Sequence, residues 1–250
     1  MITYRTPATV QRDGHLLAAS LDVEWTKNYR IPDGNVPFCW SITWLHLPKT
    51  PSPPPEEFAF TSFYVSGPGQ TQELIHSADQ AITTMLEKAD LIIGHQVSSD
   101  LAILRNASER PLASVQALRE RWHDRKNTPA LAKRTVVDSR YDVGNVLAGT
   151  SRRLVDVCGE LALDVTQPEL ARQSMTALHR DGWLGDQDPE ARERITVLNL
   201  RHGLSAAYVA ARATGRLHWT GTVNVNRILH DQLTGHGIDW PKSPTFQALL

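Results

Sequence analysis

The sequence is poor in cysteine, lacks long apolar runs and carries almost no net charge. Its two cysteines, Cys39 and Cys158, form at most one disulfide and do not have the spacing of a metal site. A reducing compartment is expected, so we predict a cytoplasmic protein. No stretch approaches the roughly 20 apolar residues of a membrane helix. The first residues, with Arg5, Arg12 and Asp13, lack the apolar core of a secretory signal, and no membrane partner is expected.

A formal net charge of −1 argues against a protein that coats long nucleic acid by charge alone. The charge is unevenly distributed, because the stretch 105–134 holds eight Lys and Arg against three acids, a balance of +5. One interpretation is a solvated helix face. The other is a surface that follows nucleic-acid phosphates, to which Arg121, Arg125 and Lys126 would contribute.

Composition and pattern predict one large α/β domain. Hydrophobic residues make up 41% and charged residues 21% of the chain, which is typical of globular proteins. Apolar and aromatic patterns predict strands at 15–25, 36–47, 57–65, 89–94 and 134–137, and helices at 71–88, 98–106, 111–124, 139–147, 151–161, 189–214 and 225–233. This order predicts a mixed β-sheet flanked by helices over residues 1–214. Residues 215–250 are expected to form a tail or a peripheral extension.

The first candidate site lies where the first predicted strand ends, at Leu21-Asp22-Val23-Glu24-Trp25. Side chains two residues apart on a strand face the same way, so Asp22 and Glu24 project together. Two adjacent carboxylates repel each other unless a cation lies between them, and hard divalent ions prefer oxygen ligands. The alternative is a strand end that has reached solvent.

A second candidate acid, Asp100, follows a strand, a loop and the start of a helix. The strand ends at Gly94, and Ser98 or Ser99 is the expected N-cap of the helix. An acid in the first turn also interacts favourably with the helix dipole, so helix capping is the alternative role. A strand with two acids, followed by a strand-loop-helix with one, is the layout of a two-metal nuclease.

These segments resemble the motifs of a known family. Residues 21–26, LDVEWT, are similar to the first motif of the DEDD 3′–5′ exonucleases, the proofreading-exonuclease superfamily with a ribonuclease H-like fold. Residues 93–101, IGHQVSSDL, are similar to the second motif, usually Gly-His-Asn-x-x-Phe-Asp, from which Gln96 and Ser99 depart. The resemblance runs from about residue 16 to residue 214.

The resemblance implies a ribonuclease H-like mixed sheet and metal-dependent 3′–5′ exonuclease activity at a DNA or RNA 3′ end. Two Mg²⁺ or Mn²⁺ ions, about 3.5–4 Å apart, would lie between Asp22, Glu24 and Asp100. Asp22 would bridge both ions. Trp25 and Tyr29, which follow the acids, could stack on a terminal base. The oligomeric state stays open.

The third motif departs from the family, in which the last long helix carries an acid five residues after a His or four after a Tyr. If His202 is the family's His, Ala207 stands at the acid position; in the tyrosine register, Leu198 replaces the Tyr and His202 the acid. Ala207 could be an engineered inactivating change, or His202 could replace the missing acid as a metal ligand or a proton acceptor. A solvent-facing histidine is the simplest alternative.

The incomplete third motif leaves alternative functions open. The chain could be a catalytically inactive nuclease-fold protein that binds nucleic acid or another partner. It could also catalyse another metal-dependent reaction in the same pocket.

Overall fold

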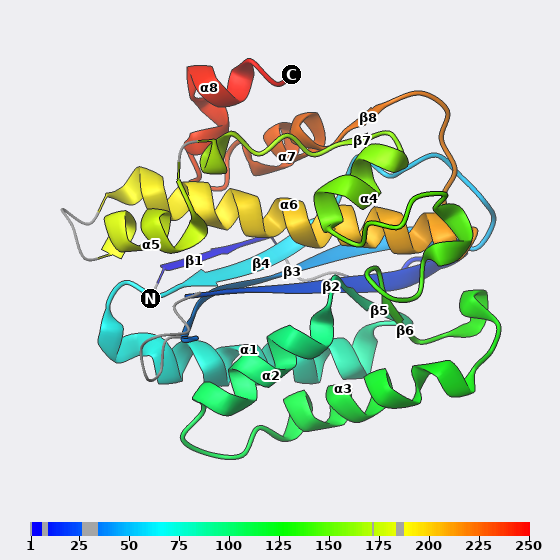
Figure 1. Ribbon diagram of the computed structural model, residues 1–250, viewed down its shortest axis with the longest axis horizontal. Helices are drawn as coiled ribbons and strands as arrows, with labels where there is room; N and C mark the ends of the chain where they lie inside the picture. The colour runs from blue at the N-terminus through cyan, green and yellow to red at the C-terminus, as the bar shows by residue number, and fades with distance from the viewer. Residues whose placement is uncertain (1, 7–9, 27–34, 172, 184–187) are drawn as a thin grey trace.

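The computed structural model describes residues 2–6, 10–26, 35–171, 173–183 and 188–250. Within these residues, a six-stranded sheet is covered by helices on both faces (Figure 1). In spatial order its strands are β1 (Ile2–Arg5), β4 (Ala59–Tyr64), β3 (Pro37–Pro48), β2 (His15–Trp25), β5 (Leu91–Gly94) and β6 (Val136–Asp138). β2 is antiparallel to β3 and parallel to β5, which is parallel to β6. The mixed sheet confirms the predicted α/β class and is consistent with a ribonuclease H-like fold.

β2 lies inside the sheet because its side chains are buried on both faces. Ala18 belongs to the hydrophobic core on one face, and Ala19 and Leu21 belong to the core on the other. The antiparallel register pairs Asp22 with Ser41 of β3, and the pairing shifts just after residue 24. By the two-residue period of a strand, Asp22 faces the same side as Ala18.

The helices form two layers (Figure 1). One face of the sheet carries α1 (Thr71–Lys88), α2 (Val97–Ala107) and α3 (Ala113–Asp124). The other side carries α4 (Leu154–Glu160), α5 (Met175–Trp183), α6 (Pro189–Ala213), α7 (Val225–Leu233) and α8 (Pro244–Gln247). α6 contacts both β2 and β3, so its side chains reach the face that bears Asp22.

α6 is the predicted last long helix. It begins at Pro189, after the N-cap Asp188, whose side chain accepts a backbone N–H of the first turn. The buried alanines Ala206, Ala207, Ala210 and Ala211 keep the helix narrow where it packs on the core. A methyl group added at Gly203 would already touch Thr43 of β3, at 3.4 Å. This close approach brings the middle of α6 over the carboxyl end of β2.

Two local predictions are wrong. Residues 139–147 do not form a helix but turns and a short 3₁₀ segment, because Asp138 and Asp142 accept backbone N–H groups there. The N-cap of α2 is neither Ser98 nor Ser99: the helix begins at Val97, after Gln96, which has a left-handed backbone with φ of 63°. β1, α5 and the short pair of β7 (Leu163–Asp164) with β8 (Val223–Asn224) were not predicted.

Residues 215–250 form a structured extension. Buried side chains from this segment, including Leu229, Trp240 and Phe246, belong to the same core as α6. The extension pairs β8 with β7 and places α7 against α6. The segment therefore packs on the α6 side of the domain. No helix in the described part of the chain combines the length and the apolarity needed to span a membrane.

Candidate functional site

Asp22 and Glu24 project together from the carboxyl end of β2, as the strand period predicts. Their side chains are 13% and 9% exposed. With His202 they form a group whose potential ligand atoms all lie within 4.8 Å of one another. The sheet fixes the direction of both side chains, because β2 pairs with β3 along the whole segment and with β5 up to Ser20.

His202 reaches the two acids from α6. Its Nδ1 lies 3.1 Å from Oε1 of Glu24 and 3.5 Å from Oδ2 of Asp22. His202 is therefore a residue of the site and not a solvent-facing histidine. Ala207, in contrast, is 1% exposed and packs in the core under α6. The geometry thus brings His202, and not Ala207, to the two acids.

Two neighbouring amides complete the cluster and were not singled out from the sequence. Nδ2 of Asn199 donates to Oδ2 of Asp22 at 2.5 Å, and Nε2 of Gln167 lies 3.0 Å from Nε2 of His202. Asn199 is three residues before His202 on α6, so the helical period could have identified it. Gln167 lies in a loop far from the motifs, and no sequence pattern indicates its contact.

Asp100 approaches the cluster from the first turn of α2. Gly94 permits the tight turn before this helix, since a Cβ there would lie 2.8 Å from Cβ of Val97. The Asp100 carboxylate accepts the backbone N–H of Val23, the residue between the two acids of β2. It is 3% exposed, and among the described residues its Oδ2 has no hydrogen-bond partner. Asp100 thus lies beside the cluster with one buried oxygen unpaired.

The electrostatics of the site demand positive charge. Burial, reinforced by the charge of Glu24, raises the pKa of Asp22 to about 6, although hydrogen bonds from His202 and Asn199 oppose the shift. Burial and then the charges of Asp22 and Glu24 raise the pKa of Asp100 well above its usual value. Burial alone would lower the pKa of His202, but its hydrogen bonds and attraction to both acids raise it to about 10.

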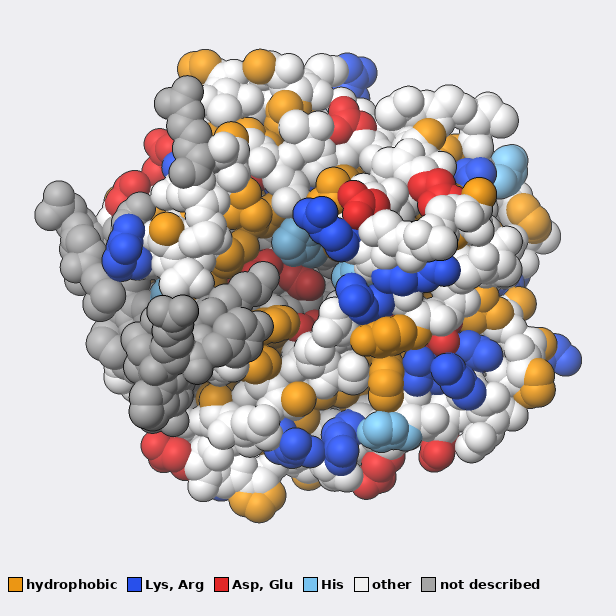
Figure 2. Space-filling model, viewed as in Figure 1, with side chains coloured by type: hydrophobic (Ala, Val, Ile, Leu, Met, Phe, Trp, Pro, Cys, Tyr) orange, Lys and Arg blue, Asp and Glu red, His pale blue; other side chains and the backbone are white. Residues whose placement is uncertain are grey.

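The donor set fits a divalent ion. Two ligands on opposite sides of such an ion lie about 4–5 Å apart, which matches the 4.8 Å span of the group. Two carboxylates and an imidazole suit Mn²⁺ and other transition ions better than Mg²⁺, which prefers oxygen. The unpaired oxygen of Asp100 is available to a second ion. Figure 2 shows acidic and histidine side chains in a hollow of one face, with Lys and Arg side chains beside it.

The structure corrects one predicted nucleic-acid contact. The Arg125 side chain is 4% exposed, its Nε lies 2.8 Å from Oδ2 of Asp142, and its guanidinium stacks 4.0 Å from the Trp122 ring centroid. The Arg125 guanidinium is buried in this internal ion pair, so it cannot contact a phosphate. Arg121 and Lys126 are exposed, so their contact with nucleic acid stays a prediction.

The aromatic contacts with a terminal base, predicted for Trp25 and Tyr29, stay predictions. Trp25 is half-buried at the end of β2, one residue after Glu24. Tyr29 lies outside the described residues.

A further positive charge lies near the cluster. After burial, the charges of His202 and Arg140 lower the pKa of His95 to about 4, so both residues act electrostatically on that ring. The Arg140 guanidinium lies 5.8 Å from the Tyr141 ring and donates to the carbonyl of Arg152. Tyr141 is 49% exposed. Arg140 thus connects the surroundings of His95 with the exposed ring of Tyr141.

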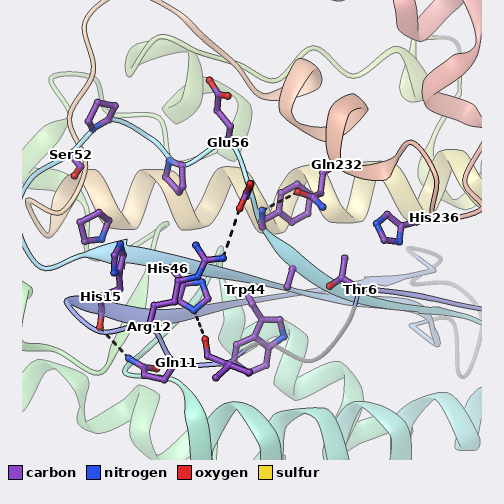
Figure 3. Close-up of a pocket in the computed structure, with 17 residues that line it drawn as sticks. Thr6, Gln11, Arg12, His15, Trp44, His46, Ser52, Glu56, Gln232 and His236 are labelled. Atoms are coloured by element: carbon purple, nitrogen blue, oxygen red, sulfur yellow. Dashed lines mark hydrogen bonds and ion pairs between the residues drawn. The ribbon is translucent and has the colours of Figure 1, made fainter.

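A separate groove of about 1030 Å³ lies at the opposite end of β2 (Figure 3). His15, the first residue of that strand, lines it together with Trp44 and His236. None of the site acids and not His202 borders it. We assign the chemistry to the acidic cluster, because charge and ligand geometry converge there and not in the groove.

Comparisons with known proteins assign no family to the chain. Neither a scan against protein-family models nor a search of curated proteins found a match. The function is therefore inferred from the geometry of the site and from the motif resemblance.

Proposed function

We propose that the protein is a metal-dependent 3′–5′ exonuclease that hydrolyses phosphodiester bonds of DNA or RNA. The observation that carries the proposal is the convergence of Asp22, Glu24 and His202, with ligand atoms within 4.8 Å, beside the buried carboxylate of Asp100. This cluster lies at the carboxyl end of an inner strand of a ribonuclease H-like sheet. The direction of degradation rests on the motif resemblance.

Each residue has a distinct task in this proposal. A bound divalent ion would supply charge for the phosphate oxygens and lower the pKa of a water molecule. Asp22 and Glu24 would hold this ion, and Asp100 would offer its unpaired oxygen to a second ion. In its neutral form, His202 would fill the fourth ligand position or accept a proton from the attacking water. Asn199 orients Asp22 through its 2.5 Å hydrogen bond.

The substrate surface that we propose continues from the cluster to Arg140 and Tyr141. Arg140 can pair with a phosphate, while the exposed ring of Tyr141 can stack on a base. A surface that combines the two suits a single strand, whose bases are free to stack. A duplex would present its phosphates but hide its bases.

A second candidate function is a nuclease-fold binding module without catalysis. It is favoured by the direct contacts of His202, whose protonated ring would balance one of the two charges of Asp22 and Glu24 without any metal ion. In that case the cluster is an internal ion-pair network. The substrate surface at Arg140 would still bind nucleic acid.

One experiment separates the two candidates. A 5′-labelled single-stranded DNA or RNA oligonucleotide is incubated with the protein and Mn²⁺ or Mg²⁺, with Asp22→Asn as the isosteric control. The exonuclease predicts a ladder of products shortened from the 3′ end, which the control lacks. Full-length oligonucleotide that is bound by both proteins would reject the exonuclease and support the binding module.

A further inference from the structure

A buried ion pair lies next to His202 on α6. Arg201 and Glu169 are both fully buried, and the guanidinium donates to the two carboxylate oxygens at 2.8 and 2.9 Å. Successive helical residues point about 100° apart, so Arg201 faces away from the acids that His202 contacts. A buried ion pair is a weak source of stability, because desolvation opposes the attraction, but it fixes the geometry of the groups that it joins.

The C-terminal extension completes this network. Oδ1 of Asn226 accepts from Nε of Arg201 at 2.7 Å, and Nε1 of Trp240 donates to Oε1 of Glu169 at 2.8 Å. Nδ2 of Asn226 also donates to the carbonyl of Thr166 at 3.3 Å. The extension therefore holds the chain on both sides of residue 167, at Thr166 and at Glu169.

Gln167 lies between these two anchors and contacts the site. Its side-chain amide is 3.0 Å from Nε2 of His202, while Nδ1 of the same ring faces Glu24. A hydrogen bond to the far nitrogen of a histidine sets the orientation of the ring. Small shifts of the loop at residues 166–169 would therefore turn the His202 ring relative to the acids.

We infer that Asn226 and Trp240 of the C-terminal extension are positioning residues for His202, acting through the loop 166–169 and Gln167. The chain of contacts runs from Trp240 to Glu169, along the loop to Gln167, and from its amide to the His202 ring. The use of this positioning for a metal site rests on the proposed function. The contacts themselves involve no metal.

The primary test uses the ring nitrogen resonances of His202 in the metal-free protein, assigned by their loss in His202→Asn. Trp240→Phe keeps an aromatic ring but removes the donor to Glu169, and Gln167→Ala removes the last contact. Both should shift the His202 ring resonances. The matched control is Trp219→Phe, which removes an indole hydrogen bond of 2.8 Å to the Leu161 carbonyl in the same extension. It should leave the His202 resonances in place.

Two results would overturn the inference. The first is that Gln167→Ala shifts the His202 ring resonances while Trp240→Phe leaves them at their wild-type positions. The other is an equal shift in Trp219→Phe, which would indicate general loosening of the extension. If Trp240→Phe does not fold, Asn226→Asp provides the same test, since it keeps the acceptor for Arg201 and removes the donor to Thr166.

Mn²⁺ affinity, measured by calorimetry, is the second readout. Gln167→Ala should weaken binding about tenfold, as expected for a residue that orients a metal ligand. Trp240→Phe should weaken Mn²⁺ binding less than Gln167→Ala does. Because Trp240 acts through Gln167, the double variant Gln167→Ala, Trp240→Phe should bind Mn²⁺ with the same affinity as Gln167→Ala alone. Additive losses would contradict the inferred route. Wild-type protein that binds no Mn²⁺ would reject the proposed metal site, and the His202 resonances would then decide the inference by themselves.

Discussion

His202 stands where a carboxylate would complete an all-oxygen site, and this choice of side chain has a testable consequence. In His202→Asp, a carboxylate oxygen would occupy nearly the position of Nδ1, 3.1 Å from Glu24 in the native protein. An added oxygen ligand favours Mg²⁺, which accepts imidazole poorly. We expect the ratio of Mg²⁺-dependent to Mn²⁺-dependent hydrolysis to rise severalfold, as measured by initial rates on a labelled oligonucleotide. An unchanged ratio would argue against a ligand role for His202.

Ala207, in contrast to His202, lies in the core, where a new acid should only destabilise the protein. Because it is 1% exposed in the core under α6, Ala207→Asp would bury an unpaired acid. We expect a loss of about 3 kcal/mol in the free energy of unfolding. That loss lowers the melting temperature by about 10 °C, with no gain in activity. Ala207→Ser, with a smaller polar group, should lose less. Raised activity in Ala207→Asp would restore the register in which this position holds the family's acid.

The residues of the site differ in how far sequence alone could identify them. Asp22 and Glu24 follow from the two-residue period of a strand, and the motif resemblance drew attention to Asp100 and His202. Gln167 reaches His202 across 35 residues of chain through a loop without periodicity, so only the tertiary structure reveals it. A local sequence pattern indicates which way a side chain points. It does not indicate which distant segment of the chain packs against that side chain.

Among the elements, α3 and the turn after β6 are joined by Arg125. This guanidinium pairs with Asp142, whose other oxygen lies 3.1 Å from Nη1 of Arg134. Removing one partner of a buried pair leaves the other charge poorly compensated. We expect Arg125→Ala to lose about 3 kcal/mol of unfolding free energy in urea titration. The exposed Arg121→Ala should change it by less than about 0.5 kcal/mol. Equal effects would show that the Arg125 pair contributes nothing specific.

α5 is attached to the sheet by a buried histidine, which predicts acid sensitivity. His179 stacks on Phe38 of β3 at 3.8 Å, and its Nδ1 lies 2.6 Å from the hydroxyl of Tyr64 of β4. Burial lowers the pKa of His179 to about 3, below the unfolded value near 6.5. As the pH falls, His179 therefore binds a proton in the unfolded chain at a higher pH than in the folded protein. The stability that neutral His179 contributes is complete above pH 6.5 and declines as the pH falls toward 3.

His179→Gln tests this attachment. The stability difference between wild type and variant should shrink by about 2 kcal/mol between pH 7 and pH 5, since one proton distinguishes them. Urea unfolding at both pH values measures it, and groups that titrate in both proteins cancel in the comparison. A difference that is constant with pH would show that His179 does not titrate in this way.

The long helices and strands were predictable because their patterns are strong, while the elements that depend on docking were not. α1 and α7 have the predicted bounds, 71–88 and 225–233. Residues 139–147 have apolar spacing that suits a helix, but the buried carboxylates of Asp138 and Asp142 hold their backbone in turns. The extension 215–250 has little periodicity, and its place in the fold depends on Trp240 and its contact with Glu169.

For the molecule as a whole, a net charge of −1 means that nucleic-acid binding has to come from a local surface. For the proposed function, two surfaces are candidates for this role: Arg121 and Lys126 near the end of α3, and Arg140 with Arg152, whose backbone carbonyl accepts from the Arg140 guanidinium. Arg140 is close enough to His95 to lower its pKa, and His95 in turn senses His202. We expect a substrate that binds at the cluster to contact Arg140.

We therefore expect the double variant Arg140→Gln, Arg152→Gln to weaken binding of a single-stranded oligonucleotide more than Arg121→Gln, Lys126→Gln. Each lost phosphate contact lowers the slope of log affinity against log salt by about 0.7 for a single strand. Loss of both arginine contacts should thus reduce the slope by about 1.4, measured by fluorescence anisotropy across a salt series with Asp22→Asn protein to prevent cleavage. Melting temperatures check that both double variants stay folded. The slope could instead change less in the Arg140, Arg152 double variant than in the Arg121, Lys126 double variant. That result would assign the substrate path to the α3 surface, as the charge balance of residues 105–134 indicates.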